Sequence, residues 1–142
     1  MDMALSLAKE AARRGEVPVG ALVVRDGRIL GTGFNLREHT QDPTAHAEII
    51  AIRQAAQALS SWRLNGADLY VTLEPCLMCA GAIYQARVAR VYFGTKDPKA
   101  GAMGSLYEVQ QDTRLNHRVV VESGLQADSC GEVLKEFFQA RR

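Results

Sequence analysis

Two short stretches, far apart along the chain, constrain its fold most strongly because their side chains must meet to be useful. The first is His46-Ala47-Glu48 and the second is Pro75-Cys76-Leu77-Met78-Cys79. Together they supply one imidazole, one carboxylate and two thiols, the groups needed by a zinc site that activates water. Each stretch follows a strand-like segment and reads as a helix start. The fold must therefore bring two helix starts together.

The spacing within each stretch separates metal ligands from a proton carrier. Residues three apart share a helix face, so Cys76 and Cys79 can bind one ion. Residues two apart do not, so His46 and Glu48 are not both expected to be ligands. One histidine and two cysteines leave the fourth tetrahedral position for water, and Glu48 is free to move protons beside it. Pro75 is expected in the first turn of its helix, whose dipole favours thiolates.

Length and composition favour one soluble domain over residues 1–142. Of the 142 residues, 47% are hydrophobic and 23% are charged, which is ordinary globular composition. No apolar run approaches the ~18 residues of a membrane span, and the first residues do not resemble a signal peptide. Three cysteines, two of them in Cys-x-x-Cys, argue against a disulfide framework. We therefore expect a cytoplasmic protein without membrane contact.

The net charge of +1 argues against a general nucleic-acid binder, which should be basic overall. Any such contact must come from a local patch, and the candidate is the tail with Lys135, Arg141 and Arg142. The alternative is a solvated helix end, where cations suit the dipole. Phe137 and Phe138 cannot share a helix face, so we expect at least one in the core and the other exposed for stacking.

Apolar periodicity and turn signals predict alternating helices and strands. Asp26-Gly27 indicates a hairpin turn, and Gly31 and Gly33 indicate close backbone approach or a bulge. Ser129-x-x-Glu132 is a capping-box signature expected to open the last helix. We expect helices over 3–14, 45–59, 76–87, 105–110 and from 129 onwards, strands over 17–24, 28–34, 67–73, 88–93 and 117–122, and loops over 35–44 and 94–104.

The alternation of strand and helix between residues 28 and 93 predicts an α/β protein whose strands are mostly parallel. Ligands of such sheets bind at the carboxyl ends of strands. Both candidate metal stretches follow strands, so we expect both at that edge. The glycine-rich loop 94–104, closed off from the strand by Gly94, is long enough to be expected functional.

Other interpretations of these residues stay open. Cys-x-x-Cys is also a redox motif, although this gives no task to the histidine and glutamate of the first stretch. A closed structural zinc site would need a fourth ligand, for which Cys130, His39 and His117 are candidates. Cys130 is otherwise expected to be a small buried residue in or near a helix cap.

His46-x-Glu48 followed by Pro75-Cys76-x-x-Cys79 is the signature of zinc nucleobase deaminases, and the whole chain resembles the bacterial tRNA-specific adenosine deaminases. The zinc signature is shared by cytidine, cytosine and guanine deaminases, so it indicates the chemistry and not the substrate. The likeness to the tRNA-specific family rests on flanking segments, which are residues 15–20, 33–35, 93–105, 116–119 and 137–142.

The resemblance implies a three-layer α/β/α cytidine-deaminase-like fold, with a central five-stranded mixed sheet flanked by helices, and a homodimer. It implies hydrolytic deamination of adenosine to inosine at the wobble position of a tRNA anticodon stem-loop. It further implies that His46, Cys76 and Cys79 hold Zn²⁺ and that Glu48 is the catalytic proton shuttle. The implied substrate-binding residues are Asn35 at the base, Asp97, Lys99, Asn116 and His117 at the mouth, and Phe138 and Arg141 on the RNA.

Two functions of other classes would use part of this set. A free-base or nucleoside deaminase, acting on guanine or cytosine, would share the zinc chemistry without needing the basic tail. A non-catalytic RNA-binding module with a structural zinc would not need Glu48. Neither accounts for His46, Glu48, Asn35 and the glycine-rich loop together.

Overall fold

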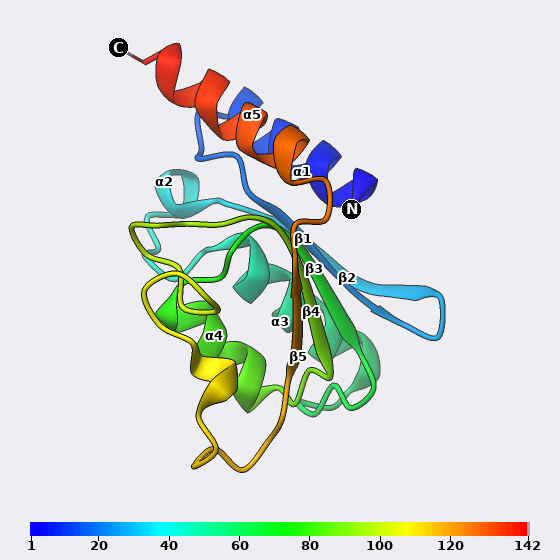
Figure 1. Cartoon of the computed structure of the whole chain (residues 1–142). Helices are drawn as coiled ribbons and strands as arrows, with labels where there is room; N and C mark the ends of the chain where they lie inside the picture. The colour runs from blue at the N-terminus through cyan, green and yellow to red at the C-terminus, as the bar shows by residue number, and fades with distance from the viewer. Residues whose placement is uncertain (142) are drawn as a thin grey trace.

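The computed structural model describes residues 1–141, in which one sheet lies between two layers of helices (Figure 1). Its strands are β1 (Gly20–Arg25), β2 (Arg28–Phe34), β3 (Asp68–Leu73), β4 (Arg90–Thr95) and β5 (Val120–Ser123). Its helices are α1 (Asp2–Arg13), α2 (Arg37–Thr40), α3 (Ala47–Leu59), α4 (Leu77–Gln85) and α5 (Ala127–Gln139), with one 3₁₀ turn, η1 (Val109–Gln111).

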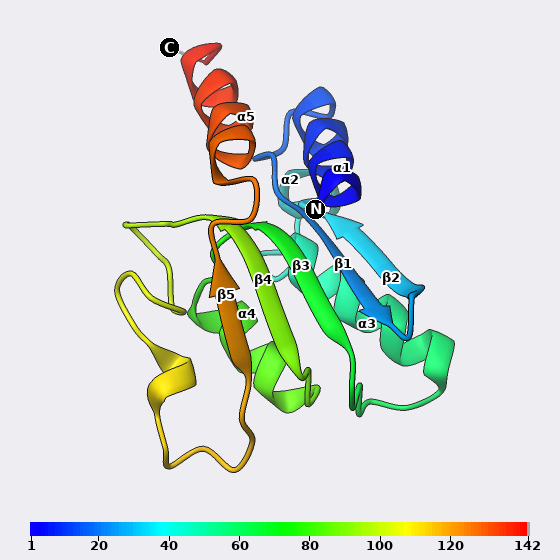
Figure 2. The same cartoon turned by 45° about the vertical axis from the view of Figure 1, so that its right-hand side comes forward.

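The sheet is mixed, with the strand order β2-β1-β3-β4-β5. β1 is antiparallel to both of its neighbours, whereas β3 and β4, and β4 and β5, are parallel. Four strands therefore run in one direction and only β1 opposes them, which confirms the expected sheet. Helices α3 and α4 cover one face, and α1 and α5 cover the other (Figure 2).

Glycines let α3 lie close against β2. A Cβ added at Gly31 or Gly33 would lie 2.2 or 2.4 Å from the carbonyl oxygen of Ala51 or Ala47, respectively. No other residue fits there without moving the helix. The register of β1 and β2 also shifts beside Gly31. The sequence indicated either a close backbone approach or a bulge at Gly31 and Gly33. The structure shows the close approach at both glycines and a register shift beside Gly31.

Several strand boundaries differ from those predicted, and two of these differences have a clear physical cause. β1 begins at Gly20 and not at residue 17, because the chain turns where the Val19 amide donates to the Val17 carbonyl at 2.9 Å. β4 does not end at Gly94 but continues to Thr95. Gly94 instead makes room for α5, since a Cβ there would lie 2.4 Å from Cys130 Sγ.

Four predictions for the second half of the chain and for the polar loop are wrong in detail. The capping box does not open α5, because Gln126, in the left-handed region with φ 54°, is the N-cap and Ser129 lies inside the helix. Residues 105–110 form no helix before η1, and β5 begins at Val120 instead of residue 117. The loop 35–44 contains the short helix α2.

The core lies mainly between the sheet and the layer of α3 and α4. Its largest fully buried apolar side chains are Val23, Leu64, Leu69, Val71, Ile83, Val88, Val91, Phe93 and Met103. Over residues 1–141, no helix is both long and apolar enough to span a membrane. This core fixes the starts of α3 and α4 at one edge of the sheet, where the candidate site lies.

Candidate active site

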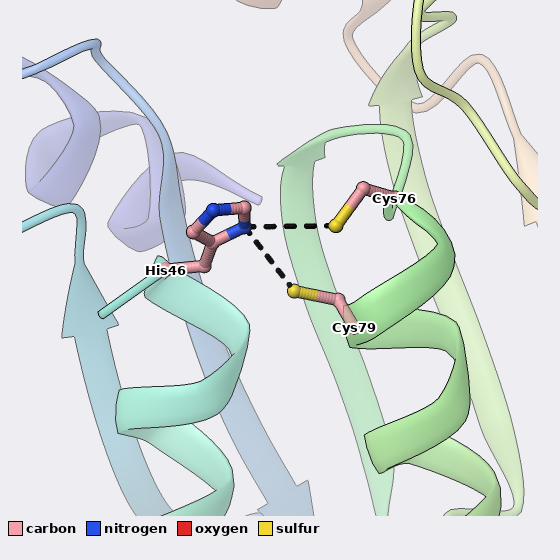
Figure 3. Close-up of side chains that lie close together, drawn as sticks. All are labelled: His46, Cys76 and Cys79. Carbon is pink, nitrogen blue, oxygen red and sulfur yellow. Dashed lines mark hydrogen bonds between the residues drawn. The ribbon is translucent and has the colours of Figure 1, made fainter. Parts of the chain in front are cut away.

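The starts of α3 and α4 meet at the carboxyl ends of the parallel strands (Figure 3). His46 is the N-cap of α3, which β2 reaches through the loop 35–46. Cys76 is the N-cap of α4, which follows β3 directly, and Cys79 lies in its first turn. Pro75 therefore precedes the N-cap and is not in the first turn as expected, because Cys76 is itself extended with φ −75° and ψ 177°.

His46, Cys76 and Cys79 form a cluster with the geometry of a metal site. His46 Nδ1 lies 3.7 Å from Cys76 Sγ and 3.5 Å from Cys79 Sγ, and the three ligand atoms all lie within 4.8 Å of one another. Tetrahedral zinc with ordinary Zn–N and Zn–S bonds would separate such atoms by ~3.6 Å. The two thiols and the imidazole therefore fit Zn²⁺ in both chemistry and spacing.

A fourth protein ligand is not found among residues 1–141. Cys130 is buried beside Gly94 on the other face of the sheet, which agrees with its expected place near a helix cap. His39 Nδ1 contacts Glu16 at 2.8 Å, and His117 Nε2 contacts the Val88 carbonyl at 2.7 Å. Three ligands with an open fourth position are typical of catalytic zinc sites rather than closed structural ones.

The thiols of Cys76 and Cys79 differ strongly in pKa. Hydrogen bonds from the Cys79 thiol, and next from the His46 ring, lower the pKa of Cys76 to about 4. The hydrogen bond to Cys76 and burial raise the pKa of Cys79 above its usual range. Two helix N-termini point toward this pair and add positive potential. A cation placed between these atoms would favour the second thiolate as well.

Glu48 is a buried carboxyl beside this cluster. It lies in the first turn of α3 with 4% of its surface exposed. Burial raises the pKa of Glu48 to about 7. A carboxyl group with such a pKa can both accept and donate a proton near neutrality.

A cavity of about 190 Å³ opens onto the cluster. Its walls come from the segment before β1, the ends of β2 and β3, the starts of α3 and α4, and the loop after β4. The lining residues are Val17, Val19, Asn35, Arg37, His46, Glu48, Leu73, Glu74, Cys76, Asp97 and Ala100. Three of the predicted ligand and proton-carrying residues thus share this cavity with Asn35 and Asp97.

Asn35 is engaged within the protein as well as lining the cavity. Its Oδ1 accepts from the Ala47 amide at 2.9 Å, and its Nδ2 donates to the Val17 carbonyl at 3.1 Å. The side chain thereby fixes the first turn of α3, which carries Glu48. One amide hydrogen of Asn35 remains for a contact with a bound molecule.

The mouth of the cavity contains only part of the predicted set. Lys99 is exposed on the same loop as Asp97. Asn116 and His117 do not line the cavity, contrary to expectation. The reason is that His117 is held by the Val88 carbonyl, which precedes the amino end of β4, whereas the cavity lies at the carboxyl end.

The tail divides as predicted between core and surface. Phe137 is buried, and Phe138 is 49% exposed. The Arg141 guanidinium lies 3.6 Å from the centroid of the Phe137 ring and donates to the Phe137 carbonyl. Lys135 is exposed on α5, and the predicted contribution of Arg142 lies outside the described residues.

Sequence reasoning missed three charged residues around the cavity. Arg37 and Glu74 line it directly. Glu16 is 2% exposed and accepts from the amides of Glu38 and His39, which holds α2 near the mouth. One signal in the sequence could have identified Glu74. It lies between a predicted strand and the candidate ligand Cys76, where a charged residue is not expected to contribute to the apolar core.

The family comparison agrees with this fold and cluster. The MafB19-like deaminase family model matches residues 1–142, and the chain is therefore a deaminase of that class. It is 49% identical over 142 residues to the tRNA-specific adenosine deaminase of Bacillus subtilis (strain 168), covering all of this chain and 88% of the relative. It is 50% identical over 143 residues to that of Haemophilus influenzae, covering 83% of the relative.

Solved structures are similar to two thirds of this chain or more. One, from a study of A-to-I editing by tRNA:A34 deaminases at the wobble position, has a TM-score of 0.91 and 48% identity, covering 94% of this chain and 97% of that one. A guanine deaminase from Bacillus subtilis has a TM-score of 0.64 and 42% identity, covering 67% of this chain and 61% of that one. The chain belongs to the tRNA-specific adenosine deaminase family.

Proposed function

We propose that this chain hydrolyses adenosine to inosine at the wobble position of a tRNA anticodon, with residues 1–142 acting as one deaminase domain. The observation that carries the proposal is the cavity that joins the three-ligand cluster to buried Glu48. Relatives with about half of their residues identical are named for this reaction. The cluster supports the chemistry, and the relatives support the substrate.

The proposed metal is Zn²⁺, with His46, Cys76 and Cys79 as its ligands. When bound, the ion supplies a water molecule of lowered pKa as the nucleophile. His46 and Cys76, two of the residues that would hold the ion, line the same cavity as Glu48. A closed structural site would leave this carboxyl group without a task.

Glu48 carries the protons in the proposed reaction. It accepts a proton from the attacking water as the water oxygen bonds to C6 of adenine, and it passes that proton to the ring nitrogen. Glu48 then takes the proton of the new C6 hydroxyl and delivers it to the amino group, so that the C6–N bond breaks, ammonia leaves and C6 keeps the oxygen as a carbonyl. The sum is adenosine plus water giving inosine plus ammonia. Burial suits Glu48 to this task because it brings the carboxyl pKa close to neutrality.

The size of the cavity suits a single base taken out of its stack. Such a base comes from a loop, because the target atom cannot be reached in a duplex. We propose that the free amide hydrogen of Asn35 contacts the base. Asp97 and Lys99 then meet the flanking nucleotides, and Arg37 adds a cation for a phosphate. Phe138 and Arg141 are proposed to contact the RNA further out.

We also propose a homodimer in the cytoplasm. An apolar groove of about 390 Å³ lies between α3 and α4, lined by Ile49, Ile52, Arg53, Ala56, Trp62, Ala82, Gln85 and Ala86. Of these lining residues, Trp62 is 55% exposed. A second copy is the proposed occupant, which would bury this apolar surface. The three free cysteines and a tRNA substrate suit a reducing cytoplasm.

The substrate assignment is tested by comparing an anticodon stem-loop that carries wobble adenosine with free adenosine, guanine and cytosine. Zinc-loaded protein is expected to form inosine in the stem-loop and to release no ammonia from the free compounds. Ammonia from guanine or cytosine, with unreacted RNA, would show that the free-base alternative is correct.

A further inference from the structure

Glu74 is a buried carboxylate outside the candidate metal cluster, and it accepts several hydrogen bonds from one loop. It lies between the end of β3 and Cys76, and 2% of its surface is exposed. Its oxygens accept hydrogen bonds from the amides of Asp97 (3.1 Å), Met103 (3.0 Å) and Ser105 (3.0 Å) and from Ser105 Oγ (2.5 Å). All four donors belong to the segment 97–105, which we call the mouth loop.

The mouth loop is built to fit this carboxylate. A Cβ added at Gly101 would lie 2.2 Å from Glu74 Oε2, so the loop can pass over the carboxylate only because residue 101 is glycine. Around it, the Ala102 amide donates to the Pro75 carbonyl at 2.9 Å, and Gly101 forms a bridge with Cys76. The mouth loop is thereby fastened directly to the strand-to-helix connection that carries a cluster cysteine.

Besides Glu74, the mouth loop is held mainly by its own short turns, in which the Gly101 amide donates to the Asp97 carbonyl at 2.8 Å and the Lys99 amide donates to Asp97 Oδ1 at 3.0 Å. It contains no regular helix or strand, and two of its nine residues are glycine. Asp97 and Ala100, from its first half, line the cavity, and Lys99 is exposed between them. Three backbone amides donate hydrogen bonds to Glu74. Without its carboxylate they would lack these acceptors, which would raise the free energy of the folded loop.

We propose that Glu74 is a positioning residue that holds the mouth loop as the substrate-binding wall of the cavity. It acts on RNA binding through Asp97 and Lys99, and not on the transfer of protons at the base. This inference rests on the proposed function, because it assumes that the mouth loop contacts the nucleotides around the reacting base. Beyond the proposed function, the inference states that one buried carboxylate fixes the position of this wall, and that this carboxylate belongs to the segment that carries Cys76.

The test is Glu74→Gln in the zinc-loaded full chain. The side chain keeps its size, but its new NH₂ group faces backbone N–H donors in place of an acceptor. The KM for the anticodon stem-loop is expected to rise about tenfold, as for the loss of a hydrogen bond to a charged group, while kcat changes less than about threefold. Hydrogen–deuterium exchange should speed up at Asp97, Met103 and Ser105 and stay unchanged in α3.

Two further variants make the result specific. Glu16→Gln removes an equally buried carboxylate that holds α2, and it must leave exchange in the mouth loop unchanged. Gly101→Ala pushes a methyl group against the Glu74 carboxylate and should reproduce the rise in KM. This second variant also decides the matter if Glu74→Gln does not fold.

The outcomes separate this inference from the proposed function. If wild-type protein deaminates the stem-loop and both variants keep its KM and its loop exchange, the positioning role is wrong. If kcat falls with unchanged KM, Glu74 acts on the chemical step and the assignment is overturned. If wild-type protein leaves the stem-loop unreacted while exchange still speeds up in Glu74→Gln, the anchoring of the loop holds and the proposed function fails.

Discussion

The local environment of an ionisable side chain decides its pKa, as a comparison of Cys76 in the site with Cys130 outside it shows. Cys76 stands at the N-cap of α4, and hydrogen bonds from Cys79 and His46 lower its pKa to about 4. Cys130 is packed in the first turn of α5, where burial raises the pKa of its thiol. The same side chain is therefore a thiolate in one place and a small apolar residue in the other.

This contrast predicts the order of thiol alkylation once the metal is removed. A pH of 6 is above the pKa of Cys76, which is therefore a thiolate. The same pH is below the raised pKa of Cys130, which stays protonated. Iodoacetamide should therefore modify Cys76 first in chelator-treated protein, as read by peptide mass spectrometry. Adding Zn²⁺ should protect Cys76. Equal modification of Cys76 and Cys130 in the metal-free protein would contradict the assigned environments.

Helix starts, rather than loops, hold the cluster, and small residues bring those helices into place. Gly33 on β2 lies against α3 just where that helix begins, so the position of His46 and Glu48 depends on the missing side chain. By contrast, Gly81 on α4 is exposed, and a Cβ there would meet nothing within 4 Å. These two glycines offer a matched pair.

Gly33→Ala should destabilise the protein by about 1–3 kcal/mol, because a methyl group 2.4 Å from the Ala47 carbonyl forces α3 outward. Bound zinc should fall with it. Gly81→Ala should leave zinc unchanged and stabilise the protein by up to ~1 kcal/mol through helix propensity. Urea unfolding and metal analysis measure both. A stable, zinc-replete Gly33→Ala protein would refute the close-packing argument.

Local signals in the sequence predicted the elements well, but long-range pairings stayed hidden. The hairpin turn forms as predicted, with Asp26 at φ 52° and Gly27 at φ 74°, because two residues specify it. The insertion of β1 between β2 and β3 depends on contacts that no local pattern reveals. For the same reason Glu74 escaped notice, since its partners follow 23 to 31 residues later. His117 was misplaced because its partner Val88 is equally distant along the chain.

At the scale of the whole molecule, the site and the apolar groove share the same two helices. The starts of α3 and α4 hold the cluster, and their facing sides form the groove. With a net charge of only +1, the proposed RNA binding depends on cations near the mouth and tail. If a second copy fills the groove, the arrangement of two catalytic sites follows directly from helix packing.

Ala82→Arg tests that arrangement. It puts a long charged side chain into the groove, where a partner would have to desolvate it. Light scattering during gel filtration should change from the mass of a dimer to that of a monomer. Lys135→Ala, on exposed α5, should leave the mass unchanged. A dimer that persists in Ala82→Arg would show that the groove is not the interface.

The most direct test of the proposed mechanism is the rate of inosine formation in Glu48→Gln on the wobble-adenosine stem-loop, with zinc measured in the same sample. Glutamine keeps the size of the side chain but cannot carry a proton. The account predicts one zinc per chain, retained RNA binding, and a rate lowered by about 10²-fold or more. A zinc-loaded variant with nearly wild-type activity would contradict the assignment of Glu48 as the proton carrier.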